Sequence, residues 1–230
     1  SRCSAVNVGS IGFNLGGCVS QYEDVGNPRS TPASGYPIGV GGAGQDLLAN
    51  DPCFDCRVVG CDVRSVGSDG IMLFGSRNLA ENNHVYDSGR FDGDCACINL
   101  WGDDNTARRN TLHDVPRNAG FQKGVRNTFE LNDMFNLCME TCDAGGIRMC
   151  NRNPHLTGNV IRWNRIVNTV GYGFRVNEFT YRSPYYSWSI YLDNISCGTI
   201  VEGNICVNAG RGSFHIHGGA DMQVENNVFV

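Results

Sequence analysis

Short runs of alternating apolar and polar residues recur along the chain, separated by Gly, Asn or Asp. Alternation with a period of two is typical of a half-buried strand. One kind of run begins with Asn and has an apolar residue two positions later. It starts at Asn83, Asn110, Asn132, Asn164, Asn204 and Asn227, and Cys61 takes the same place one unit earlier.

These starting points are separated by 22, 27, 22, 32, 40 and 23 residues. A second alternating run follows each of the first, beginning at Ile71, Ile98, Phe121, Ile147, Ile190 and Phe214. A repeat of about 22 residues built from short strands is typical of stacked coils. The pattern therefore predicts an all-β fold, a single-stranded right-handed parallel β-helix with loop insertions in its longer coils.

The Asn residues are expected to have a structural role. Asn side chains stacked at a spacing of about 4.8 Å can form a hydrogen-bonded ladder. Two inward columns should form the core. The residues that start the second runs make one of them, and the apolar positions of the first runs make the other, which comprises Val63, Val85, Leu112, Met134, Ile166, Cys206 and Phe229.

A single domain over residues 1–230 is expected, because no break in composition divides the chain. Residues 19–50, rich in Gly, Ser and Pro, are predicted to be a loop insertion, and 177–187 a second, aromatic excursion. The run at 10–16 resembles a second strand that lacks a first one. Because a solenoid needs caps, we expect a fragment of a longer β-helix, or ends that are capped by other subunits.

Charge and cysteine content narrow the functional class. The net charge of −5 is mild and scattered, which indicates no nucleic-acid partner, and no apolar run is long enough to insert into a membrane. Twelve cysteines favour a secreted, disulfide-bonded protein, although buried free thiols would also fit. No His or Cys follows Cys53-x-x-Cys56 at the spacing of a zinc site, so neither a metal nor another cofactor is expected.

Ionisable and aromatic residues gather on the outward side of the last second runs. Counting from the starting positions, the outward residues are Arg148, Tyr191 and His215, and two positions further on are Asp193 and His217, with Trp101 in an earlier coil. Asp94 and Asp143 lie four positions before the start. Rings and paired carboxylates on one face are what a saccharide site requires, so these residues are predicted to bind a polysaccharide or glycan.

Hydrolysis of a glycosidic bond needs two carboxyl groups, one acting as acid and one as nucleophile or base. Asp143 and Asp193, in successive coils, are the candidate pair. Both also suit a turn, which is a common role for Asp. They can approach each other only if the Gly145-Gly146 corner folds Asp143 back over the strand.

The basic groups of this face have two interpretations each. His215 and His217 lie on one side of a strand and could bind substrate hydroxyl groups, or could join Asp193 as metal ligands. Arg148 could form a salt bridge with either Asp or receive a substrate carboxylate.

These residues resemble the C-terminal coils of right-handed β-helix proteins similar to glycoside hydrolase family 141, which contains α-L-fucosidase and xylanase activities. The Asp-Ala-Gly-Gly-Ile run at Asp143, the strand-end Asp193 and the His-x-His-x-Gly run at 215–219 carry the resemblance, which extends over about residues 104–230. It implies that Asp143 and Asp193 are catalytic. Cys142 and Cys150, which flank the first motif, depart from the family pattern.

Three functions are open at this stage: a secreted polysaccharide hydrolase, a non-catalytic extracellular β-helix that is structural or binds glycans and is rigidified by disulfides, and a polysaccharide lyase or epimerase. Other β-helix domains of the same parent chain or assembly are further candidate partners. Asn194-Ile-Ser is a glycosylation sequon, and a glycan on Asn194 would obstruct a cleft and favour the third function. A disulfide between Cys150 and Cys197 is also predicted, because both lie near the same edge in successive coils.

Overall fold

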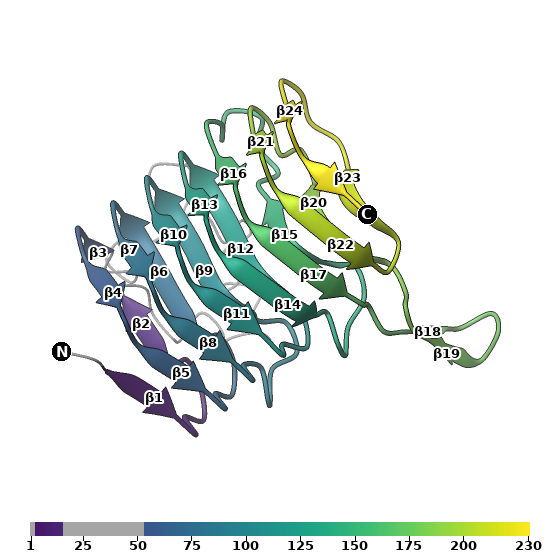
Figure 1. The fold of residues 1–230 in the computed structure, drawn as a ribbon, viewed down its shortest axis with the longest axis horizontal. Helices are drawn as coiled ribbons and strands as arrows, with labels where there is room; N and C mark the ends of the chain where they lie inside the picture. The colour runs from purple at the N-terminus through teal and green to yellow at the C-terminus, as the bar shows by residue number, and fades with distance from the viewer. Residues whose placement is uncertain (1–2, 16–52) are drawn as a thin grey trace, which may run out of the picture.

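The computed structural model describes residues 3–15 and 53–230, which wind into a solenoid of stacked strands (Figure 1). The secondary structure of these residues is strand throughout, without a helix. Accordingly, nothing in the described ranges provides a helix long and apolar enough to cross a membrane. The loop insertion predicted for residues 19–50 lies outside the described residues.

Three parallel sheets run along the solenoid. Sheet A contains β1 (Ser4–Val6), β5 (Asp62–Arg64), β8 (His84–Tyr86), β11 (Thr111–His113), β14 (Asp133–Leu137), β17 (Arg165–Thr169), β22 (Ile205–Ala209) and β25 (Val228–Phe229). Sheet B contains β2 (Phe13–Leu15), β6 (Ile71–Ser76), β9 (Ala96–Asp103), β12 (Asn118–Val125), β15 (Ala144–Cys150), β20 (Ser187–Asp193) and β23 (Gly212–Ile216), and β3 (Cys53–Phe54) pairs with the end of β6. Sheet C contains β4 (Arg57–Val59), β7 (Leu79–Glu81), β10 (Thr106–Arg108), β13 (Thr128–Glu130), β16 (Val160–Arg162), β21 (Ile200–Glu202) and β24 (Gln223–Glu225).

Each coil passes through sheets A, B and C in turn, and the next coil pairs with it strand by strand. The predicted parallel β-helix is therefore confirmed. The sequence pattern missed sheet C, because its strands have only three residues and one inward side chain. In β7, for example, the buried Ala80 lies between Leu79 and Glu81, which is too short a run to show an alternation.

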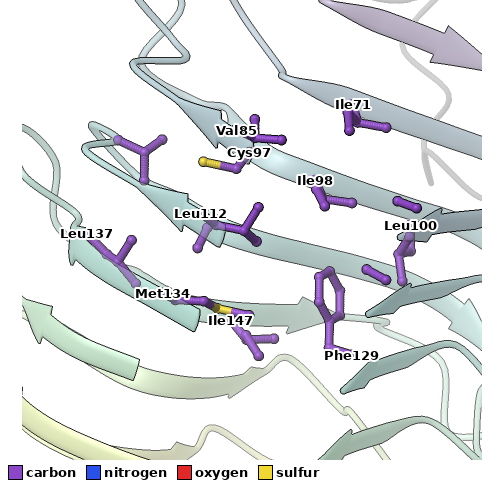
Figure 2. Packing of buried hydrophobic residues seen from close by; sticks show 14 of the residues in the cluster. Ile71, Val85, Cys97, Ile98, Leu100, Leu112, Phe129, Met134, Leu137 and Ile147 are labelled. Carbon is purple, nitrogen blue, oxygen red and sulfur yellow. The ribbon is translucent and has the colours of Figure 1, made fainter. Parts of the chain in front are cut away.

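The inward column predicted for sheet A is confirmed by the strand register. Val63 pairs with Val85, and Leu112 pairs with Val85 and Met134 on its two sides. These side chains are fully buried and meet those of sheet B in one continuous core (Figure 2). Burial of these aliphatic groups provides the main force that closes the coils.

The predicted column of sheet B is wrong at one coil. Ile98 and Ile147 both pair with Gly120, so Phe121 lies one position later and faces outward. The reason is packing from sheet C: a Cβ at Gly120 would lie 2.7 Å from the ring of Phe129. The Phe129 ring fills the space that a side chain at position 120 would occupy in the other coils.

Asn residues form a ladder at the corner between sheets C and A, as predicted. The side-chain Oδ1 of each ladder Asn accepts the backbone N–H of the Asn in the preceding coil, for example Asn110 N–H to Asn132 Oδ1 at 2.9 Å. A second ladder, which the sequence analysis missed, runs between sheets B and C through Asn78, Asn105, Asn127 and Asn159. Both ladders satisfy buried backbone groups where the chain leaves a strand.

Two segments complete the described chain. β1 pairs with β5, so the run at 10–16 does have a first strand of its own, contrary to the expectation from the sequence. Between β17 and β20 the predicted excursion leaves the solenoid as an antiparallel hairpin of β18 (Gly173–Arg175) and β19 (Thr180–Arg182) (Figure 1). Its apolar side chains are exposed, including Val176 and Phe179.

Candidate functional site

The outer face of sheet B changes from apolar to polar along the solenoid. With the register corrected at Gly120, Gln122 lies in the inner column, where it is buried between Leu100 and Met149. The two outward columns read Met72, Asn99, Phe121, Arg148, Tyr191, His215 and Phe74, Trp101, Lys123, Cys150, Asp193, His217. The last three coils therefore place a cation, two imidazoles and a carboxylate side by side.

The Gly145-Gly146 corner brings Asp143 onto this face, as the prediction required. A Cβ at Gly145 would lie 2.8 Å from Cβ of Tyr191, and one at Gly146 would lie 2.8 Å from the carbonyl oxygen of Ser189. Only glycine allows β15 to approach β20 so closely. Asp143 itself has a left-handed φ of 52°. The hydroxyl group of Tyr191 donates a hydrogen bond to its Oδ1 at 3.1 Å.

Arg148 lies between the two predicted catalytic carboxylates. Its Nη2 is 2.6 Å from Oδ2 of Asp193 and 3.9 Å from Oδ2 of Asp143. The two carboxylate oxygens are therefore no further apart than the sum of these distances. This limit falls within the separation of about 5 to 9.5 Å between the carboxyl groups of glycosidase pairs. The structure thus brings together residues that are 50 positions apart in the sequence.

The carboxylate of Asp193 is buried by its hydrogen-bond partners, whereas that of Asp143 is half exposed to solvent. The side chain of Asp193 is 3% exposed, and that of Asp143 is 52% exposed. The Oδ1 of Asp193 is 2.9 Å from Nδ1 of His217, so both of its oxygens are engaged. Burial by itself raises the pKa of Asp193, but hydrogen bonds from Arg148 and His217 outweigh it and hold the pKa below its ordinary value. Asp193 is therefore ionised at neutral pH.

An aromatic wall stands beside the carboxylates. Trp188 stacks on His215 with ring centroids 4.4 Å apart and contacts Tyr191 at 4.5 Å. Arg211 covers the ring of Tyr186 at 4.6 Å. Burial, together with the charges of His217 and Arg211, lowers the pKa of His215, which is consequently neutral at pH 7. Flat rings next to hydrogen-bonding groups match the two faces of a sugar.

Asp94 and Trp101, the remaining predicted binding residues, lie at the margins. Asp94 is highly exposed and pairs with Arg117 at 2.9 Å, and Arg117 donates to the carbonyl oxygen of Asp143 at 3.1 Å. Trp101 lies in the same column as Asp193 but three coils away, under the ammonium group of Lys123. Burial lowers the pKa of Lys123 to about 8. Trp101 therefore marks the far end of the face and does not contact the carboxylates.

The predicted disulfide between Cys150 and Cys197 is absent from the structure, in which both are buried free thiols. Their sulfur atoms have different partners, because the Sγ of Cys150 accepts from the side chain of Asn194 at 3.6 Å and that of Cys197 accepts the N–H of Ala220 at 3.3 Å. In the sequon, the hydroxyl group of Ser196 is buried and donates to the carbonyl oxygen of Asp193 at 2.6 Å. Glycosylation of Asn194 stays a prediction.

Trp188 and Arg211 complete the site, and the sequence analysis did not assign either of them to it. Alternation counted back from Ile190 places Trp188 on the inner face, yet its ring contacts outer residues. Arg211 lies before β23, outside the alternating run. An available signal was the cluster of Tyr185, Tyr186 and Trp188, in which aromatic residues lie within four positions of one another.

Two further features of the described residues concern metal binding and the shape of the surface. Within residues 3–15 and 53–230, no group of three or more His, Cys, Asp or Glu side chains is arranged to hold a metal ion. A hollow of about 390 Å³ lies elsewhere, at the turns after sheet A, lined by Asp87, Arg90, Asp114 and Glu140 among others.

Comparisons with known proteins bear on the fold more than on the chemistry. A family model described as "Right handed beta helix region" matches residues 48–229. Among solved structures, one titled "Glycoside hydrolase" is similar at a TM-score of 0.50 and 12% identity, over 74% of this chain and 32% of that one. The chain thus spans about a third of that structure. No curated protein matches the chain. At this identity the likeness is one of fold.

Proposed function

Because this chain belongs to the right-handed β-helix family, we propose that the outer face of sheet B is a polysaccharide site and that the protein is a secreted glycoside hydrolase. The observation that carries the proposal is the placement of Asp143 and Asp193 on either side of Arg148. The solved glycoside hydrolase with a similar fold is consistent with it.

The shape of the face suits an extended substrate. Coils advance by about 4.8 Å each, so the three steps from Trp101 to Asp193 extend over roughly 14 Å, about the length of a few sugar units. Trp101 at one end and His215 at the other are partly exposed and offer ring surfaces on which sugars can pack, and the buried Trp188 supports the ring of His215 from beneath. Arg211 and His215 provide hydrogen-bond donors at the second end.

The two carboxyl groups have different environments, as an acid and an ionised partner require. Asp193, held ionised by Arg148 and His217, would stabilise or attack the developing positive charge at the anomeric carbon. Asp143, half exposed, would exchange protons with solvent and protonate the departing sugar oxygen. His217 is 62% exposed, so a bound sugar could displace its ring from Asp193.

A second candidate is a non-catalytic glycan-binding protein. It is favoured by the burial of Asp193, both of whose oxygens already have partners. In that case Asp193 would only orient Arg148 and His217, and the polysaccharide would bind across Arg211 and His215 without being cleaved.

The test is turnover of a panel of polysaccharides and aryl glycosides by wild type and by Asp143→Asn. The substituted amide keeps the size of the side chain, and Asn tolerates the left-handed φ, but it cannot donate a proton to the leaving group as a carboxylic acid does. Loss of an acid or base lowers kcat by about 10²- to 10⁴-fold. Asp104→Asn is the matched control, because Asp104 has a similar φ of 58° and pairs with Arg126 on another face.

We expect Asp143→Asn to lose activity while binding to the same polysaccharide is retained, and Asp104→Asn to match wild type in both. Binding without turnover by wild type would establish the second candidate. Turnover that survives in both Asp143→Asn and Asp193→Asn would rule out the carboxylate pair. Absence of both binding and turnover across the panel would overturn the assignment of the face to carbohydrate.

A further inference from the structure

Two histidines meet on the outer face of sheet A, away from the carboxylate site. His84 lies in β8 and His113 in β11 of the next coil, and the strand register places them diagonally. Their Nε2 atoms are 2.8 Å apart. The proposed function uses neither residue, and neither belongs to an Asn ladder or to the core.

A carboxylate faces the other nitrogen of each ring. The Nδ1 of His113 is 2.8 Å from Oδ2 of Asp114, and the Nδ1 of His84 is 3.8 Å from Oδ1 of Asp62. At 2.8 Å the carboxylate of Asp114 accepts the Nδ1 proton of His113, fixes that tautomer and leaves a lone pair on Nε2. The 3.8 Å between Asp62 and His84 is too long for a hydrogen bond, so Asp62 favours a positive charge on His84 without fixing its tautomer. A carboxylate that holds Nδ1–H is also the usual companion of a metal-bound histidine.

The Nε2 lone pair of His113 and the Nε2 atom of His84 therefore meet at the same place. At 2.8 Å a proton on Nε2 of His84 is shared with His113. A metal ion that replaces this proton would be bound by the lone pairs of both nitrogens. Zn–N bonds of about 2.0–2.1 Å at a tetrahedral angle need about 3.3 Å between the nitrogens, so the rings would separate by only about half an ångström.

One of the two rings is rigid and the other is free to adjust. His113 is stacked between Tyr86 and Phe135, with ring centroids 4.9 and 4.5 Å away and planes within 8° of parallel. Its side chain is 13% exposed, whereas that of His84 is 48% exposed. A ligand held in place before binding loses little conformational entropy, and the open side leaves room for water ligands.

We propose that His84 and His113 form a binding site for a divalent transition metal ion of borderline softness, Zn²⁺ or Cu²⁺, that links two coils. The two Nε2 atoms are the protein ligands, and water completes the coordination. Imidazole nitrogen suits both ions, whereas Mg²⁺ and Ca²⁺ prefer oxygen. With only two protein ligands, such a site binds its ion reversibly.

The test is binding of Zn²⁺ by calorimetry and of Cu²⁺ by electron paramagnetic resonance, on protein first treated with EDTA. The variants are His84→Gln and His113→Gln, and the matched control is His155→Gln, which removes an exposed histidine elsewhere. Exposed thiols and the side chains of His215 and His217 are competing ligand types for these ions, so the measured quantity is the difference between each variant and wild type.

We expect each ligand variant to weaken one Zn²⁺ site at least tenfold and to remove the two-nitrogen signal of Cu²⁺, with His155→Gln unchanged. Zn²⁺ should also raise the Tm of wild type more than that of His84→Gln. If both variants bind Zn²⁺ as wild type does, the contact is only a shared proton and the proposal is wrong. Because His84 is half exposed, His84→Gln keeps the test valid even if His113→Gln does not fold.

Discussion

Replacing Asn132 with Ala tests how much one step of the Asn ladder contributes to stability. Its Oδ1 accepts from the backbone N–H and the Nδ2 of Asn110, both at 2.9 Å, and its Nδ2 donates to the carbonyl oxygen of Ala107 at 3.0 Å and to Oδ1 of Asn164 at 2.9 Å. At about 1 kcal/mol each, these four bonds predict a loss of about 4 kcal/mol in the free energy of unfolding. The buried N–H of Asn110, left without an acceptor, accounts for about 1–3 kcal/mol of this.

The assay is guanidinium unfolding followed by tryptophan fluorescence and by circular dichroism, whose transitions must coincide for a free energy to be defined. The control is Asn136→Gly in β14, the strand that begins directly after Asn132. Asn136 is less buried and has a φ of 56°, which Gly keeps, so its loss should cost less than about 1 kcal/mol. If Asn132→Ala is no less stable than this control, the buried ladder does not stabilise the fold and the reasoning is refuted.

Two further predictions concern packing and pH. Gly120→Ala should lower the free energy of unfolding by about 1–3 kcal/mol, because its Cβ would lie 2.7 Å from the ring of Phe129. The additional substitution Phe129→Leu should restore part of this loss. If the double variant is not more stable than Gly120→Ala, the packing argument is wrong. Burial raises the pKa of Asp69 to about 7 in the folded protein, whereas in the unfolded chain this carboxyl group loses its proton near about pH 4. Between about pH 4 and pH 7 the folded state therefore binds more protons than the unfolded state, and the free energy of unfolding falls as the pH rises. Asp69→Asn should therefore gain Tm relative to wild type between pH 5 and pH 8, and a constant difference in Tm would contradict the assignment.

The sequence predicts the repeat because each coil carries one Asn and one apolar residue at fixed positions. It misses sheet C because a three-residue strand such as β10, with only Ala107 turned inward, gives no period to detect. The sequence also does not reveal the register shift at Gly120. Phe121 fits the apolar pattern of the inward column better than Gly120 does, and only the three-dimensional position of the Phe129 ring keeps a side chain out of that place.

For the candidate site, alternation suffices to place Arg148, Tyr191 and Asp193 on one face. The double glycine correctly indicates where Asp143 folds back. The burial of Asp193 could not be foreseen, because it depends on how Arg148 and His217 orient their side chains in three dimensions. The place of Trp188 in the site could not be predicted either, because alternation assigns this residue to the inner face although its ring contacts residues of the outer face.

The ladder keeps nearly the same geometry whatever the length of chain between its members. Asn110 and Asn132 are 22 residues apart and Asn164 and Asn204 are 40 apart, yet the corresponding bonds are 2.9 and 3.0 Å. The additional residues of a longer coil form loops at the corners between the sheets, where a longer loop adds only a small entropic cost. Scaffold and loops can therefore diverge separately during evolution. A segment such as the β18–β19 hairpin could be lengthened, exchanged or grafted with the stacked coils left as they are.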